Sequence, residues 1–203
     1  SEKAGDTYSM VAAGARVGTG SLRRQAQLRH VRPDLRVDDV RGNVDTRLQK
    51  LDEGQFDALV LAEAGLRRLR LDHRIAEVLP FSMMLPAVGQ GALAIECRAG
   101  DAKPQAAVGA LEDGATRAAV TAERALLAQL RGGCLAPVGA WGRIESGVLH
   151  LSAVVLSADG VERMDASDQA APAEAEALGR RVADSLLARG AGLLIAAARS
   201  AGG

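Results

Sequence analysis

One cysteine in this chain of 203 residues lies in a glycine-rich turn that could expose a reactive thiol. Gly132 and Gly133 precede Cys134, and Pro137 follows it, at the end of a segment with a helical pattern. The glycines leave the thiol sterically open and the proline prevents the helix from continuing, so a bulky electrophile could reach the sulfur. Such a cysteine can instead pack as a small buried hydrophobe, and the local sequence by itself favours that alternative.

Two adjacent arginines follow a glycine turn nearer the start of the chain. Thr19 and Ser21 supply hydroxyl groups there, and Arg23 and Arg24 lie in the first turn of a predicted helix that Ser21 caps. A helix N-terminus presents free N–H groups and the positive end of the helix dipole. The combination is typical of a phosphate or carboxylate site. The alternative is an ordinary capped helix with two solvated arginines.

The same design returns after the next two predicted strands. The residues concerned are Arg41, Gly42 and Arg47 after one strand, and Ala62, Gly65 and Arg68 after the other. Three such turns in succession predict a wall of guanidinium groups that faces one cleft and suits a ligand with several carboxylates. Unrelated surface clusters are the alternative, because all but three of the 25 basic residues are arginines.

A glycine-rich stretch, residues 85–98, offers one further polar group. Its glycines bracket Gln90, whose neutral amide could line the same cleft. Cys97 ends an apolar run and is predicted to be buried. The histidines have no ligand-like spacing and the two cysteines lie far apart, so the sequence predicts neither a metal site nor a disulfide framework.

The composition excludes several classes of function. Hydrophobic residues make up 48% of the chain and charged residues 25%, which is typical of a soluble globular protein. Aromatic residues make up only 2% and the net charge is zero, which argues against nucleic-acid binding. No apolar run is long enough to cross a membrane and no signal peptide opens the chain, so we expect a cytoplasmic protein.

The hydrophobic pattern predicts an α/β region followed by an α+β region. The first region has strands at 15–19, 35–40 and 58–62, and helices at 22–28, 44–53 and 63–69. Strands that alternate with helices predict a parallel sheet, whose carboxyl ends would bring the arginine turns together. A connector at 79–90, a strand at 91–97 and a helix at 103–111 follow. The last region has a helix at 115–131, antiparallel strands at 141–144, 148–156 and 161–165, and helices at 172–189 and 192–199.

Together these segments resemble the porphobilinogen deaminase (hydroxymethylbilane synthase) family. The matching stretches are 17–28, 39–69, 85–98 and 123–139, in the family's order and spacing. The resemblance implies that residues 1–85 form domain 2, an α/β domain similar to a type II periplasmic-binding lobe. It implies that residues 86–113 are a crossover with a remnant of domain 1. Residues 114–203 would form the C-terminal α+β domain, with its three-stranded antiparallel sheet.

The resemblance also implies a chemistry. The family joins four porphobilinogen units head to tail, releasing ammonia from each, to give hydroxymethylbilane in tetrapyrrole biosynthesis. The growing polypyrrole hangs from a dipyrromethane cofactor, which a thioether links to the cysteine corresponding to Cys134. This role needs a thiolate, because a soft nucleophile traps the electrophilic methylenepyrrolenine left by ammonia loss.

Site residues follow from the same resemblance. Arg41 and Arg47 are assigned to catalysis. The pyrrole carboxylates are assigned to Ser21, Arg23, Arg24, Arg41, Arg47 and Arg68, and the cleft is lined by Thr19, Gly42, Ala62, Gly65 and Gln90.

The chain departs from the family pattern in two places. Gly20 stands where many members have serine, and the family's N-terminal Ser-x-Lys-Asp motif, which carries the main acid, is absent. We therefore expect this polypeptide alone to be inactive, less stable than the whole, or the partner of a separate N-terminal fragment. The strand at 91–97 would lack its sheet neighbours and expose apolar side chains. The family implies a monomer when complete.

Two alternatives from other classes remain. The arginine turns alone would serve a non-catalytic anion-binding protein of periplasmic-binding-like architecture. The chain could also be an assembly protein that keeps the shell of an enzyme without its acid. An adduct of two pyrrole units on Cys134 would discriminate the deaminase from both.

Overall fold

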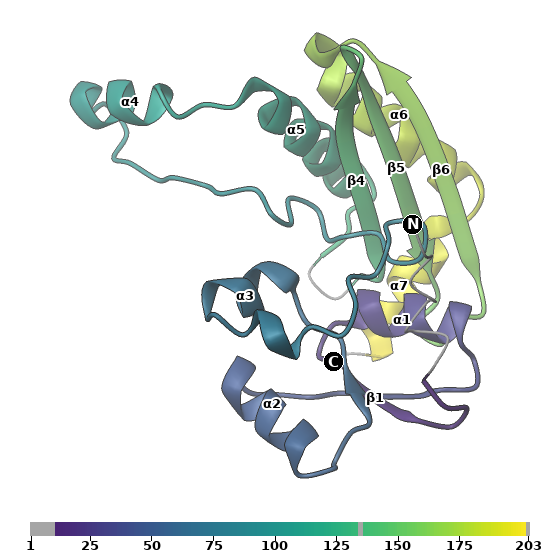
Figure 1. Cartoon of the computed structure of the whole chain (residues 1–203). Helices are drawn as coiled ribbons and strands as arrows, with labels where there is room; N and C mark the ends of the chain where they lie inside the picture. Colours follow the sequence, from purple (N-terminus) through teal and green to yellow (C-terminus); the bar gives the residue numbers. More distant parts are fainter. Residues whose placement is uncertain (1–10, 134–135, 202–203) are drawn as a thin grey trace.

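A computed structural model describes residues 11–133 and 136–201 of the chain. Its first part is a three-stranded parallel sheet with strand order β2-β1-β3, which confirms the predicted parallel arrangement (Figure 1). The strands are β1 (Arg16–Gly18), β2 (Arg36–Asp38) and β3 (Ala58–Leu59). The helices that follow them are α1 (Leu22–Val31), α2 (Val44–Asp52) and α3 (Glu63–Arg68).

Strand β3 is shorter than the apolar run 58–62 that was predicted as a strand, and the burial of the residues explains the difference. Val17 of β1 and Val37 of β2 are 2% and 5% exposed and form the core of this sheet with Leu28 of α1. In contrast, the residues of the run 58–62, which includes β3, are only half-buried or exposed. The chain leaves the ladder after Val60, whose N–H still donates to the Gly18 carbonyl at 3.0 Å.

The second part is a three-stranded antiparallel sheet with order β4-β5-β6, as predicted. Its strands are β4 (Val138–Glu145), β5 (Val148–Leu156) and β6 (Arg163–Ala170), and its helices are α5 (Gly114–Gln129), α6 (Ala175–Ala188) and α7 (Ala191–Ala201). The strand predicted at 161–165 corresponds to β6, which begins two residues later, because residues 157–162 form the turn between β5 and β6. The predicted helix at 172–189 begins as a separate 3-10 turn, Pro172–Glu174.

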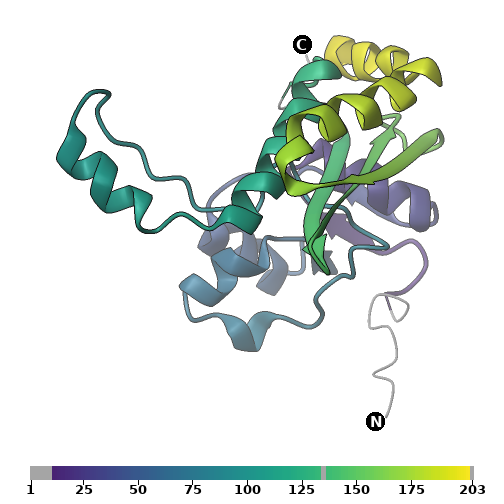
Figure 2. The ribbon, with the colours of Figure 1, turned by 90° about the horizontal axis from the view of Figure 1, so that it is seen from above.

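Strand β5 joins the two parts because its alternating side chains face opposite ways. Leu149 and Leu151 are fully buried in the core formed with α5, α6 and α7. Val154 and Leu156 are fully buried in a smaller cluster with Ala26 of α1. The antiparallel sheet is therefore covered by its own helices on one face and by α1 on the other, as the view from above shows (Figure 2).

Hydrogen bonds reinforce this junction at the far end of α1. The Arg29 guanidinium donates to the carbonyls of Val37 and Ala158, both at 2.8 Å. His30 Nδ1 lies 2.8 Å from the Gly160 carbonyl. Thus the helix that carries Arg23 and Arg24 is tied directly to the turn between β5 and β6.

Replacing Gly160 by Ala is expected to weaken this junction. Gly160 has a φ of +78°, and a Cβ there would lie 2.6 Å from the Ala26 carbonyl oxygen. Backbone strain and overpacking together should lower the free energy of unfolding by about 2 kcal/mol, measured by urea denaturation. Gly147→Ala is the matched control, because Gly147 has a φ of +80° with nothing within 4 Å of the added carbon. Equal losses in both variants would show that the contact with α1 does not matter.

The prediction of a strand at 91–97 is wrong. The segment is extended but has no strand partner among the described residues, and Leu93 and Ile95 are 84% and 57% exposed. Cys97 is half-buried, not buried as predicted. A strand needs a hydrogen-bonded neighbour, so an apolar run alone did not suffice. The expected exposure of apolar side chains is confirmed.

Helix α4 (Ala102–Gly109) follows this segment and has no buried residue. Both ribbon views show it projecting from the rest of the molecule at the end of the extended chain (Figures 1 and 2). None of the helices in the described part of the chain has the length and apolar character needed to cross a membrane.

Candidate functional site

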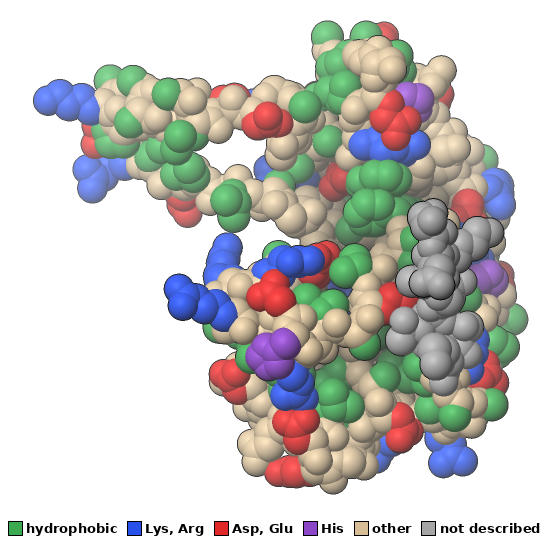
Figure 3. All heavy atoms as spheres, in the orientation of Figure 1, with side chains coloured by type: hydrophobic (Ala, Val, Ile, Leu, Met, Phe, Trp, Pro, Cys, Tyr) green, Lys and Arg blue, Asp and Glu red, His purple; other side chains and the backbone are tan. Residues whose placement is uncertain are grey.

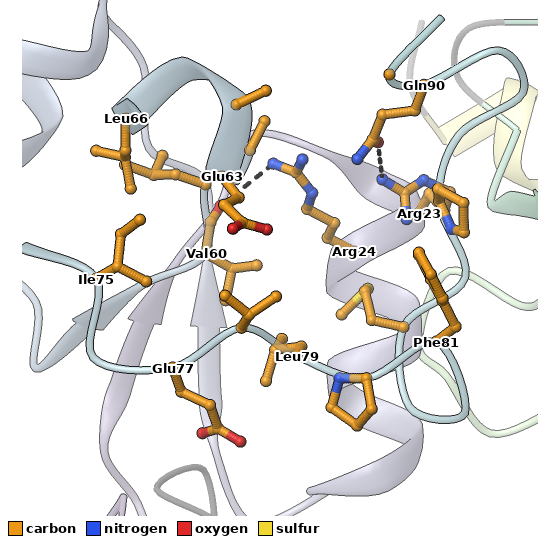
Figure 4. A pocket seen from close by; sticks show the side chains of 18 of the residues that line it. Arg23, Arg24, Val60, Glu63, Leu66, Ile75, Glu77, Leu79, Phe81 and Gln90 are labelled. Atoms are coloured by element: carbon orange, nitrogen blue, oxygen red, sulfur yellow. Dashed lines mark hydrogen bonds between the residues drawn. The ribbon is translucent and has the colours of Figure 1, made fainter. Parts of the chain in front are cut away.

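A cavity of about 850 Å³ lies between the parallel sheet, the connector that follows α3, and the α5–β4 pair. Its wall is mostly apolar, with Val60, Leu66, Ile75 and Leu79 on one side (Figure 4). The space-filling view shows a hollow beneath the projecting segment that carries α4. Basic side chains gather over α3 below this hollow (Figure 3). The predicted site residues that line this cavity are Arg23, Arg24, Ala62 and Gln90.

Arg23 is a buried cation held by the connector. The residue is only 6% exposed. Its guanidinium donates to the Leu85 carbonyl and, at 3.2 Å, to Gln90 Oε1. Burial, followed by the neighbouring charge of Arg24, lowers the pKa of Arg23 to about 10. The guanidinium therefore stays protonated at neutral pH, and two of its five N–H donors are already used by the protein.

Arg24 reaches across the cavity toward β3 (Figure 4), where its Nη1 donates to the Val60 carbonyl at 3.3 Å. Burial and then the charge of Arg47 lower its pKa. No carboxylate among the described residues forms an ion pair with Arg23, Arg24 or Arg47. These three arginines are partly buried, lie close enough to repel one another, and have no carboxylate partner in the described part of the chain to offset their charge. Such an arrangement favours the binding of an anion.

Of the two arginines in the second arginine turn, Arg47 lies near Arg24 and Arg41 does not. Arg47 is half-buried; its Nε donates to the Gly42 carbonyl at 2.8 Å, and its Nη2 lies 3.8 Å from where a Gly20 Cβ would be. Arg41, by contrast, has a side chain 90% exposed and pairs with Asp39 at 2.8 Å, which raises its pKa. The structure thus brings Arg47 toward Arg24 and leaves Arg41 in solvent.

None of the remaining predicted residues in the described part of the chain lines the cavity. Ser21 is the N-cap of α1 but makes no capping bond with its side chain, so its hydroxyl is not used by the helix. Thr19 is fully buried, and its Oγ1 has no hydrogen-bond partner. Gly42 has a φ of +119°, which turns the chain before α2. Gly65 and the exposed Arg68 lie on α3. Cys134 lies outside the described residues.

One site residue was missed by the sequence reasoning. Glu123 of α5 is 6% exposed and lines the cavity, and its two oxygens accept from the Gly89 N–H at 2.6 Å and the Gly142 N–H at 2.7 Å. Burial raises the pKa of Glu123, and the two backbone hydrogen bonds oppose that rise. The sequence did contain a sign of this role, because Glu123 lies at helical spacing from Val120 and Leu127 and so interrupts the apolar stripe of the helix with an acidic residue.

Two aromatic residues also meet at this cavity. The rings of Phe81 and Trp141 stack with centroids 4.2 Å apart, and the Arg143 guanidinium lies 4.4 Å from the centre of the Trp141 ring. Both Phe81 and Trp141 line the cavity. Because the chain has a single tryptophan, its fluorescence reports on this wall.

The fold and the site define an α/β unit, with two arginines in the wall of its cavity, joined to an α+β unit. Comparison with known proteins is more specific. The family model described as porphobilinogen deaminase, dipyromethane cofactor binding domain, matches residues 2–106, and the porphobilinogen deaminase C-terminal domain matches residues 117–188. The chain belongs to the porphobilinogen deaminase family, which confirms the resemblance seen in the sequence.

Similar curated proteins carry the same family name. The porphobilinogen deaminase of Desulforudis audaxviator is 52% identical over 198 residues, covering 98% of this chain and 64% of the relative. That of Xanthomonas campestris is 50% identical over 94% of this chain and 62% of the relative, and that of Syntrophotalea carbinolica is 47% identical over 95% and 61%. The chain therefore spans slightly less than two thirds of the length of these relatives.

Proposed function

We propose that this chain supplies the carboxylate-binding and cofactor-carrying parts of a porphobilinogen deaminase. The reaction joins four porphobilinogen units into hydroxymethylbilane with release of ammonia. The observation that carries the proposal is the pair Arg23 and Arg24, which lines one cavity of a chain in this family, with the charge of Arg47 close to Arg24 and no carboxylate partner for any of the three among the described residues. Porphobilinogen and the growing polypyrrole are the ligands proposed for that cavity.

The residues of the cavity suit a dipyrromethane that carries several carboxylates. Arginine forks bind carboxylates in two parallel hydrogen bonds, and a buried cation binds them more strongly than a solvated one. When bound, the cofactor supplies the anchored end to which new pyrrole units are added. We propose that Cys134 attaches it, and that the apolar wall around Leu79 and Phe81 contacts the faces of the pyrrole rings.

The arginines differ in what they can contribute. Arg24 and Arg47 have few protein partners and are proposed to hold ligand carboxylates, with Ser21 donating its hydroxyl. Arg23 is proposed to act mainly by its charge, since the connector occupies two of its donors. Arg41 and Arg68, both exposed, would have to turn inward to reach the same ligand.

The remaining predictions from the resemblance are kept as proposals. We propose the division into residues 1–85, 86–113 and 114–203, the likeness of the first part to a periplasmic-binding lobe, and roles in catalysis for Arg41 and Arg47. A monomer, a cytoplasmic location and a separate N-terminal fragment stay predictions. A non-catalytic anion-binding protein remains the second candidate function, because the cation cluster alone would support it.

Replacing Arg24 by Met is expected to weaken porphobilinogen binding. The substitution keeps most of the stem and removes a partly buried charge that has no carboxylate partner among the described residues, so the loss should be about 2 kcal/mol, or roughly 30-fold in Kd. Quenching of Trp141 fluorescence gives the measurement. Arg180→Met is the control, because Arg180 lies on the exposed face of α6 and pairs with Glu176. Equal weakening in both variants would contradict a specific role for Arg24.

Intact mass spectrometry of the purified chain tests the proposed function. A deaminase chain is expected to carry an added mass of two pyrrole units after exposure to porphobilinogen. A chain that binds porphobilinogen but gains no mass would support the anion-binding alternative. Bilane formation by the same sample tests the prediction that this chain alone is inactive.

A further inference from the structure

The connector between the two sheets is held at one point by buried polar side chains of α1. Gln27, which is 1% exposed, accepts from the Leu85 N–H at 2.8 Å and donates to the Leu85 carbonyl at 3.1 Å. Arg23 donates to the same carbonyl. One connector residue therefore has its backbone fully used by side chains of a helix 58 or more positions away in the chain.

A second attachment comes from helix α5 and strand β4. The Glu123 carboxylate accepts from Gly89 N–H of the connector and from Gly142 N–H of β4. The Ala140 N–H of the same strand donates to the Pro86 carbonyl at 2.9 Å. The carboxylate is thus a bridge that fastens the connector to α5 and β4 at once.

The residue next to this bridge is a proposed site residue. Gln90 follows Gly89 directly, and its Oε1 accepts from Arg23 Nη2 at 3.2 Å and from the Ala87 N–H at 3.3 Å. Displacement of Gly89 would move Gln90, and Arg23 would lose one of its two partners in the cavity wall.

We propose that Glu123 is a positioning residue, which holds the connector against β4 so that Gln90 and Arg23 keep their places in the cavity wall. The proposal deepens the proposed function, and its binding readout rests on that function. The choice of residue supports the assignment. A buried carboxylate is costly to desolvate and rarely improves stability over an apolar side chain, whereas it can accept from two backbone N–H groups at once.

The isosteric variant Glu123→Gln separates positioning from simple packing. A glutamine has one acceptor oxygen, so its NH2 group would face one of the two backbone donors. We expect hydrogen exchange at the Gly89 or Gly142 amide to accelerate about 100-fold, because its bond opens locally. Exchange at the Thr116 amide, which is bonded to Asp113 at the start of α5, should not change. Unchanged exchange at both glycine amides would overturn the proposal.

Binding supplies the second readout. We expect Glu123→Gln to raise the Kd for porphobilinogen about tenfold, and to have no further effect when Gln90 is already Ala, because the two residues act through one contact. Glu176→Gln, on the exposed face of α6, is the matched control and should bind as the wild type does. Lowered thermal stability with unchanged Kd would show a merely structural role and overturn the proposal.

Two further outcomes keep the tests distinct. If the wild type does not bind porphobilinogen, the proposed function fails while the exchange experiment still decides whether Glu123 holds the connector. If Glu123→Gln does not fold, Glu123→Asp keeps the charge on a shorter stem that cannot reach both amides. In Glu123→Asp, hydrogen exchange should accelerate about 100-fold at the Gly89 or the Gly142 amide, as in Glu123→Gln. Unchanged exchange at both amides would overturn the proposal.

Discussion

Replacing Cys134 by Ser is expected to abolish the two-pyrrole mass adduct completely, and with it any bilane formation. A serine hydroxyl is not ionised near neutral pH and is a weak nucleophile unless a base activates it, whereas a cysteine supplies a thiolate. Helix α5 ends at Gln129, and Gly132, two residues before Cys134 in the sequence, packs closely on Leu127, since a Cβ would lie 2.7 Å from Leu127 Cδ1. Intact mass after incubation with porphobilinogen gives the measurement.

The chain provides its own control for this experiment. Cys97 is the second thiol, half-buried in the extended segment before α4. Cys97→Ser should keep the full adduct, because that cysteine has no part in the proposed attachment. An adduct that survives in Cys134→Ser, or disappears in Cys97→Ser, would place the attachment elsewhere.

Replacing Gly179 by Ala is expected to destabilise the C-terminal part of the chain severely. Gly179 lies in α6 where that helix crosses α5, and a Cβ there would be 2.2 Å from the Ala122 carbonyl oxygen and 2.9 Å from the Leu126 N–H nitrogen. Both neighbours are backbone atoms, so the helices would have to move apart. Overpacking of this kind should cost about 3 kcal/mol, seen as a lowered midpoint of urea denaturation.

Gly192 is the matched control for a glycine within a helix. It lies in α7, and a Cβ there would make an ordinary contact of 3.6 Å with the Leu187 side chain. Gly192→Ala should leave stability unchanged or raise it by up to about 1 kcal/mol, because alanine is the better helix former. A similar loss in both variants would mean that the close crossing of α5 and α6 is not what Gly179 permits.

Local patterns predicted most of the elements because each depends on near neighbours in the chain. The capped helix after Gly42 is an example: Asn43 Oδ1 accepts from the Thr46 N–H at 2.8 Å and starts α2 at the predicted residue. The hairpin signal at Ser146-Gly147 likewise placed the turn between β4 and β5. Alternation of strands and helices predicted the parallel sheet, and hairpin signals between successive strands predicted the antiparallel one.

The strand predicted at 91–97 failed for the complementary reason. Its pattern of Leu93 and Ile95 describes a chain that would suit a sheet, but a strand exists only where another strand accepts its hydrogen bonds. The two side chains are instead exposed. The local pattern contains no information about whether that neighbour is present, and only the resemblance to the family led us to expect that it would be missing.

The sequence by itself determined the family, the order of the elements and the chemical character of the site, because arginines at successive strand ends are a local property. Only the tertiary structure decided how those arginines differ. Arg23 donates to a carbonyl 62 positions away, and Glu123 accepts from an amide 34 positions away. Contacts over such separations depend on how the two sheets pack around α1, which no local pattern specifies.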